Sequence, residues 1–80
     1  MSDYDVLYKI EKHFGVMSVT PHGWSKELNL VSWNDAPAKF DIRDWDPAHE
    51  RMSRGITLTE LQAKKLYEIL KSVFESESEV

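Results

Sequence analysis

The chain has 80 residues, no cysteine, an apolar fraction of 41% and a formal net charge of −4. A chain this short forms one domain with a thin core, and without cysteine it has no disulfide framework, so a homodimer is a reasonable expectation. It has neither a run of about 18 apolar residues nor the apolar block of a signal peptide, so we expect a cytoplasmic protein without a membrane partner.

The first predicted element covers residues 5–20. From Val6 to Ile10 the apolar residues occupy even positions, which is the period of a β-strand, and Gly15 interrupts the extended run. We interpret this segment as one long strand, or as two short strands with a bulge or bend near Gly15. A helix over residues 3–14 is the competing interpretation, because apolar residues there also fit helical spacing.

The second predicted strand covers residues 24–33, between turn signals at 20–23 and 34–37. Successive side chains of a strand point to opposite faces. On this rule Trp24, Lys26, Leu28 and Leu30 share one face, and Val31 and Trp33 lie on the other.

The third predicted strand covers residues 38–45. Phe40 and Ile42 point to one face and resemble core residues. An antiparallel sheet with one solvated face shows this alternation, so the opposite face is predicted to be exposed to water. It carries Lys39, Asp41, Arg43 and Trp45.

A loop over residues 46–53 and a short strand over 54–58 follow, and Gly55 permits a close backbone approach. The order of elements predicts an α+β fold, in which several antiparallel strands precede one C-terminal helix. We expect a single domain over residues 1–74 and an acidic, disordered tail over 75–80.

The helix begins with a capping box, in which Thr59 and Gln62 each satisfy a backbone amide of the other. An amphipathic stripe at spacings of three and four follows it, and such a stripe is typical of a core face or a dimer interface. The stripe consists of Leu66, Ile69, Leu70, Val73 and Phe74.

The residues do not favour an enzyme. His13, His22 and His49 lack metal-ligand spacing, and we interpret them as surface or turn residues. The sequence has no Gly-rich phosphate loop and no nucleophile elbow motif. We therefore expect no catalytic residue, metal site, cofactor or small-molecule substrate.

Aromatic and basic residues instead gather in residues 23–58, which hold all three tryptophans and five of the ten basic residues. Flat rings stack on bases and cations meet phosphates, so this combination suits single-stranded nucleic acid. Six acidic residues share residues 21–58, so such a site requires positive and negative charges to be sorted between faces. From spacing alone, a core position is favoured for any single tryptophan, but three tryptophans near Lys26, Lys39 and Arg43 weaken that interpretation for the set.

Several blocks of the sequence resemble the transcriptional coactivator family called positive cofactor four. They are F-D-I-R-D-W at 40–45, a loop with proline, R-G-I-T-L-T at 54–59, and the capped helix with Gln62 and Leu66. G-W-S-K-E-L-N-L-V-S-W-N-D at 23–35 resembles the small bacterial branch of this family. The resemblance covers about residues 23–72.

The resemblance implies an α+β fold with a four-stranded antiparallel sheet followed by one C-terminal helix. It also implies a homodimer, with helices at the interface, that binds single-stranded DNA across its sheets with little sequence preference. The sequence lacks the Ser- and Lys-rich leader of eukaryotic members, so coactivator activity is not implied. We therefore predict a sequence-tolerant binder of single-stranded DNA, or RNA, that acts in transcription or DNA maintenance at the nucleoid. The predicted nucleic-acid contacts are Trp24, Lys26, Trp33, Lys39, Arg43, Trp45, Arg51 and Arg54, and Phe40 is an alternative to Trp33 for stacking.

Two alternatives stay open at this point. Tryptophan and arginine also dominate protein–protein hot spots, so the same sheet face could bind a protein partner. Lys26 could form an ion pair with Glu27 instead of meeting a phosphate. Under the nucleic-acid hypothesis, replacing Trp45 by alanine weakens binding without unfolding the protein.

Overall fold

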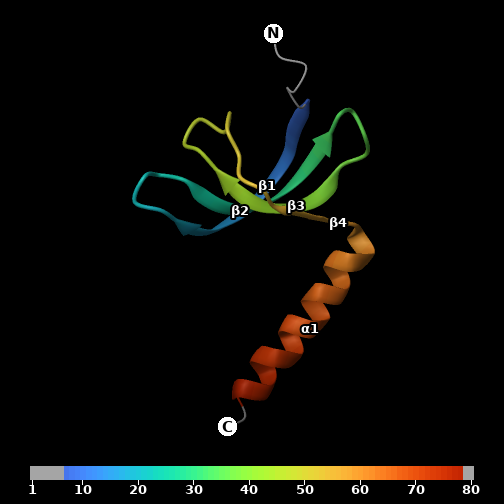
Figure 1. The fold of residues 1–80 in the computed structure, drawn as a ribbon. Coiled ribbons are helices and arrows are strands. Elements are labelled where there is room, and N and C mark those ends of the chain that lie inside the picture. Colours follow the sequence, from blue (N-terminus) through green and yellow to red (C-terminus); the bar gives the residue numbers. More distant parts are fainter. Residues whose placement is uncertain (1–6, 79–80) are drawn as a thin grey trace.

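The computed structural model describes residues 7–78. It contains four strands followed by one helix: β1 (Tyr8–Val19), β2 (Ser25–Trp33), β3 (Lys39–Trp45), β4 (Ile56–Leu58) and α1 (Glu60–Ser78). Neighbouring strands are antiparallel, and their order in the sheet follows their order in the chain (Figure 1). The predicted α+β fold is therefore confirmed.

Strand β1 runs from Tyr8 to Val19, which confirms a strand there and excludes the helical alternative over residues 8–14. Residues 1–6 lie outside the described part of the chain. The register between β1 and β2 shifts at three places, one of them between His13 and Gly15, where the sequence predicts a bulge. Bulges bend a strand and increase its twist, so β1 can wrap around a curved sheet.

The β2–β3 hairpin closes through Asn34 and Asp35, whose φ angles are 52° and 63°. The backbone N–H of Ala36 donates to the carbonyl of Trp33 at 2.9 Å. Positive φ at both central residues matches the twist of an antiparallel hairpin, and Asn and Asp tolerate this conformation. The predicted turn is confirmed.

The pairing between β2 and β3 places their odd-numbered residues on one face, called the inner face below. The Tyr8 ring lies 6.1 Å from the Trp33 ring and 5.3 Å from the Trp45 ring, measured between centroids. These tryptophans end two antiparallel strands, so they lie at opposite ends of the inner face. One tyrosine reaches both because the sheet curls around it, and Figure 1 shows this curvature.

The inner face is a buried polar and aromatic layer, not a solvated surface. Asp41 and Trp45 are completely buried, and Arg43 is largely buried, whereas Phe40 and Ile42 on the outer face are only half-buried. The expectation that Asp41, Arg43 and Trp45 face water is therefore wrong. The alternation of residues along β3 correctly separates the two faces of the sheet. However, the segment between β3 and β4 folds back over the face that was expected to be exposed to solvent.

The outer face is open, because α1 extends away from the sheet beyond β4 (Figure 1). A groove of about 820 Å³ with a mostly apolar lining lies between the helix and the sheet. The radius of gyration is 14.9 Å, against about 12 Å for a compact chain of this length. The groove is lined by, among others, Leu28, Phe40 and Ile42 from the sheet and Leu66, Leu70 and Phe74 from the helix.

Helix α1 begins at the predicted capping box. The Gln62 N–H donates to the Thr59 hydroxyl at 3.1 Å, and the Thr59 N–H donates to Gln62 Oε1 at 2.9 Å. The helix continues to Ser78, so residues 75–78 are helical and do not form the disordered tail that the sequence suggests. Residues 79–80 lie outside the described part of the chain.

Candidate nucleic-acid interface

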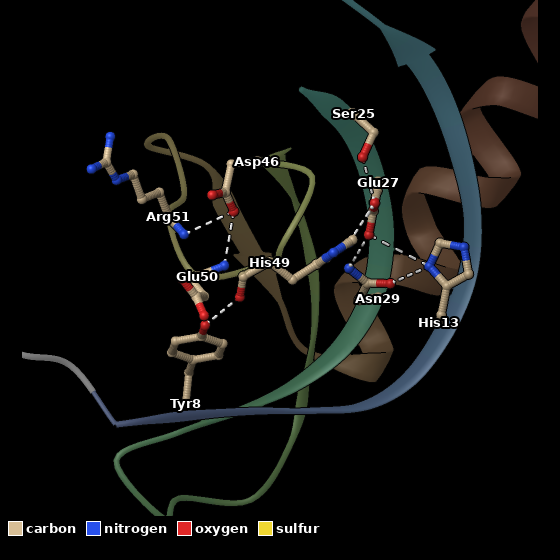
Figure 2. A network of polar contacts seen from close by, with 9 residues as sticks. All are labelled: Tyr8, His13, Ser25, Glu27, Asn29, Asp46, His49, Glu50 and Arg51. Carbon is tan, nitrogen blue, oxygen red and sulfur yellow. Dashed lines mark hydrogen bonds and ion pairs between the residues drawn. The ribbon is translucent and has the colours of Figure 1, made fainter. Parts of the chain in front are cut away.

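The β3–β4 loop, residues 46–55, is a folded unit held by Asp46. Asp46 Oδ1 accepts the backbone N–H groups of Glu50 at 2.8 Å and of Arg51 at 3.0 Å. The hydrogen bond from Arg51 is the main reason that the pKa of Asp46 is lowered from its ordinary value of 3.8. The Asp46 carboxylate therefore stabilises the fold of its own loop, as Figure 2 shows.

His49 fastens this loop to the inner face. Its φ angle is 58°, which is uncommon for a residue with a side chain, and its carbonyl accepts a hydrogen bond from the Tyr8 hydroxyl. Its ring stacks on the Trp45 ring at a centroid distance of 5.8 Å and an interplanar angle of 25°. Its Nε2 lies 2.8 Å from Glu27 Oε2, so that nitrogen carries the hydrogen.

Glu27 is the centre of a polar network on the inner face (Figure 2). Its carboxylate accepts hydrogen bonds from the Ser25 hydroxyl at 2.5 Å, from Asn29 Nδ2 at 3.1 Å and from His49. His13 Nδ1 lies 2.7 Å from Asn29 Oδ1 and 3.6 Å from Glu27 Oε1. Burial raises the pKa of Glu27, but the hydrogen bonds and the His49 charge outweigh it and lower this pKa below 4.5.

Arg43 is held within the protein. Its Nε and Nη2 donate to the two carboxylate oxygens of Asp41 at 2.7 and 2.8 Å, and its Nη1 donates to the Ser53 carbonyl at 3.3 Å. Its guanidinium lies 4.5 Å from the centre of the Trp33 ring. The side chain is only 13% exposed. The expectation that Arg43 meets a phosphate is not supported, because its charge balances the buried Asp41 and its donors hold the β3–β4 loop.

Gly55 makes the close approach that the sequence suggests, but the neighbour is β3 and not a ligand. A Cβ atom there would lie 2.3 Å from the Ile42 carbonyl oxygen and 2.4 Å from Arg43 Cβ. The loop therefore needs glycine to rejoin the sheet beside Arg43.

The three tryptophans differ in exposure. Trp45 is fully buried, so it cannot act as the base-stacking platform that the sequence suggests. Trp33 and Trp24 are half-buried and keep part of their surface accessible. Phe40, the other predicted stacking residue, lies on the outer face against Phe14, with ring centroids 5.7 Å apart.

The predicted basic contacts also divide into two groups. Lys26 forms an ion pair with Asp44 across the strands at 3.3 Å, and not with Glu27. Lys39, Arg51 and Arg54 are exposed, and none of them forms an ion pair with a described acidic side chain. Figure 2 shows the Arg51 guanidinium pointing away from the network.

The polar network on the inner face was not predicted from the sequence. It consists of Tyr8, His13, Glu27, Asn29 and His49. The alternation of polar Ser25, Glu27 and Asn29 in β2 was an available signal for a polar inner face. The two histidines come from β1 and the β3–β4 loop, and no spacing rule connects segments so far apart in the chain. Both lie at the surface or in a turn, as the sequence predicts, but the hydrogen bonds of their rings to Asn29 and Glu27 were not predicted.

In residues 7–78 no group of three or more His, Cys, Asp or Glu side chains could hold a metal ion. No helix in the same range is long and apolar enough to cross a membrane.

Comparisons with known proteins agree with the family resemblance of residues 23–72. The family described as Transcriptional Coactivator p15 (PC4) matches residues 20–69. A protein from Treponema pallidum (strain Nichols), described as "Uncharacterized protein", is 39% identical over 69 residues, which cover 86% of this chain and 81% of that protein. The matched residues include β2, β3, the β3–β4 loop and the first half of α1. The chain therefore belongs to the Transcriptional Coactivator p15 (PC4) family.

Proposed function

We propose that this protein is a non-enzymatic, sequence-tolerant single-stranded DNA-binding protein that acts as a homodimer in transcription or DNA maintenance at the nucleoid. The observation that carries the proposal is a set of three exposed cations that form no ion pair with an acidic side chain of residues 7–78: Lys39, Arg51 and Arg54. Lys39 lies on the inner face by register, and the two arginines lie on the loop that covers this face. Family membership supports nucleic acid as the ligand.

The distribution of charge reconciles this function with a net charge of −4. The carboxylates of Glu27 and Asp41 on the inner face are buried, and each is satisfied by partners within the protein. Repulsion from more distant acids is screened beyond about 8 Å at physiological ionic strength. A bound strand would therefore be influenced mainly by the exposed cations near it.

Trp33 and Trp24 are the aromatic surfaces that remain accessible to bases. The Trp33 ring lies 6.1 Å from the Tyr8 ring and 4.5 Å from the Arg43 guanidinium, so these contacts position it and little ordering is needed when a base contacts its accessible part. Base stacking on an aromatic ring contributes about 1–3 kcal/mol and depends little on sequence. The binding of Lys39, Arg51 and Arg54 to phosphates adds a term that is also independent of sequence.

The homodimer is supported by the open groove between α1 and the outer face. Exposed apolar side chains on a helix that packs loosely on its own chain require a partner for burial. A second copy supplies a helix of the same apolar character. The proposed dimer interface contains Leu66, Ile69, Leu70, Val73 and Phe74, of which Leu66, Leu70 and Phe74 line the groove.

Titration of the intrinsic tryptophan fluorescence with oligo-dT tests the function. We expect quenching by oligo-dT, weaker binding to a duplex of equal length, and a loss of about 1–3 kcal/mol in Trp33→Ala. Far-UV circular dichroism confirms that the variant is folded. Trp33→Ala binding with unchanged affinity would remove this ring from the interface.

A protein-interaction module is the competing function. The hypothesis requires exposed tryptophan and arginine side chains on the sheet, but Trp45 is fully buried and Arg43 is paired with Asp41. No response of the fluorescence to oligo-dT at low salt would favour this alternative over nucleic-acid binding.

A further inference from the structure

The surface of the Glu27 network is formed by two imidazoles. The side chains of His13 and His49 are 51% and 40% exposed, whereas the Glu27 side chain beneath them is 4% exposed. Together with Ile10 and Asn29 they line a hollow of about 300 Å³ on the inner face. A ligand on this part of the face therefore meets the histidines before it meets the carboxylate.

Both imidazoles can gain a second proton without losing their present hydrogen bonds. His13 Nδ1 faces the acceptor Asn29 Oδ1, and His49 Nε2 faces the acceptor Glu27 Oε2, so each of these nitrogens already carries its hydrogen. Protonation then takes place on the opposite nitrogen of each ring. The charge of the cluster of His13, Glu27 and His49 changes from −1 to +1 when both rings are protonated.

The other charged groups around this cluster do not cancel the change. Asp41 and Arg43 from β3 form a bidentate pair with each other. The Asp46 carboxylate of the loop binds backbone N–H groups of the same loop, and its charge also acts on His49, but this charge is constant over the pH range considered. Arg51 points away from the cluster in Figure 2, and Glu50 is exposed.

The remaining polar neighbours are uncharged: Tyr8 from β1 donates its hydroxyl hydrogen to the His49 carbonyl, and Ser25 and Asn29 from β2 donate to Glu27. Histidine is the residue type that ordinarily changes charge near neutral pH, and in the described part of the chain His13 and His49 are the imidazoles of this cluster.

We propose that His13 and His49 make nucleic-acid binding pH-dependent, so that affinity rises as the pH falls through the range in which histidine becomes charged. This inference rests on the proposed function, because it concerns the same inner face. At high pH the buried Glu27 charge disfavours a phosphate over the hollow. At low pH the two imidazolium rings cover that charge and attract the phosphate.

The affinity for oligo-dT, measured by fluorescence anisotropy between pH 5.5 and 8.0, tests the proposal. Thymine carries no charge over this range, so a change in affinity originates in the protein. We expect affinity to rise by roughly threefold to thirtyfold on acidification, as two added exposed ion pairs would produce. The slope of log affinity against log salt should become more negative by about 1.4.

A double variant and a matched control test whether the pH dependence of oligo-dT affinity originates in His13 and His49. His13→Asn with His49→Gln keeps an N–H donor near each original nitrogen but cannot gain a proton, so the pH dependence should disappear. His22→Asn replaces the exposed histidine of the β1–β2 turn, and this control variant should retain the pH dependence of binding. Glu27→Gln should raise affinity at pH 8.0, because it removes the negative charge without changing the shape of the side chain.

The outcomes separate this proposal from the proposed function. Binding by the native chain that does not change with pH would overturn the histidine proposal and leave the function intact. A pH dependence that persists in the double variant and is lost in His22→Asn would also overturn it. Absence of oligo-dT binding at every pH would overturn the function and the histidine proposal together.

Discussion

Around Trp45, the inner face is packed as tightly as a protein core. The Tyr8 ring lies 5.3 Å away, the His49 ring stacks at 5.8 Å, and Met52 forms an isolated bridge with the Trp45 backbone. A small domain has few such side chains, so each one carries a large share of stability. Trp45 is therefore structural, and its role is to support the loop that bears His49.

Trp45→Ala should lower the free energy of unfolding by about 3–5 kcal/mol, because the remaining cavity cannot be filled by neighbours. Thermal or urea denaturation measures the loss, and Trp45→Phe should recover part of it. An alanine variant that unfolds like the native protein but binds oligo-dT less tightly would show that this ring faces the ligand.

Because of Glu27, the stability of the folded protein should decrease at acidic pH. Its pKa is lowered below the ordinary value of 4.5 by its hydrogen bonds, so its contribution is present above pH 4.5 and is lost as the pH falls through the folded-state pKa. The melting temperature of Glu27→Gln should therefore fall less steeply than that of the native protein below pH 4.5. Glu68→Gln, on the exposed side of α1, is the control. Parallel curves for the native protein and Glu27→Gln would contradict this account.

At the scale of elements, the sequence predicts the strands, turns and helix because each has a local cause. The Asn34–Asp35 turn and the capping box of Thr59 and Gln62 depend on neighbouring residues and are confirmed. The burial of Trp45 depends on the β3–β4 loop folding back over the sheet, which is a long-range event. Period-two patterns distinguish two faces but do not indicate which one a later segment covers.

Helix α1 is the element whose packing the single chain leaves incomplete. Leu70→Glu places a carboxylate in the apolar groove and should convert the proposed dimer to a monomer, because burying an unpaired charge is unfavourable. Ser72→Glu adds the same charge on the exposed side of the helix and should leave the dimer unchanged. Analytical ultracentrifugation measures both, and a native protein that sediments as a monomer would contradict the dimer.

At the scale of the whole molecule, the positions of the charged side chains matter more for nucleic-acid binding than the net charge of −4. The inner-face acids are buried and paired, whereas Lys39, Arg51 and Arg54 extend into solvent. The sequence indicated a nucleic-acid ligand from residue types, and these three cations, which it predicts as nucleic-acid contacts, are exposed in the structure. It could not show that Arg43 is held by Asp41, because this pairing depends on side-chain geometry within the curled sheet.

The salt dependence of oligo-dT affinity tests the central claim most directly. Three phosphate contacts by Lys39, Arg51 and Arg54 predict a slope of log affinity against log salt of roughly −2 at pH 8.0, where histidine is uncharged. Replacing all three by glutamine should bring the slope close to zero in a protein that remains folded. An affinity of the native protein that does not change with salt, or an unchanged slope in the triple variant, would contradict the account.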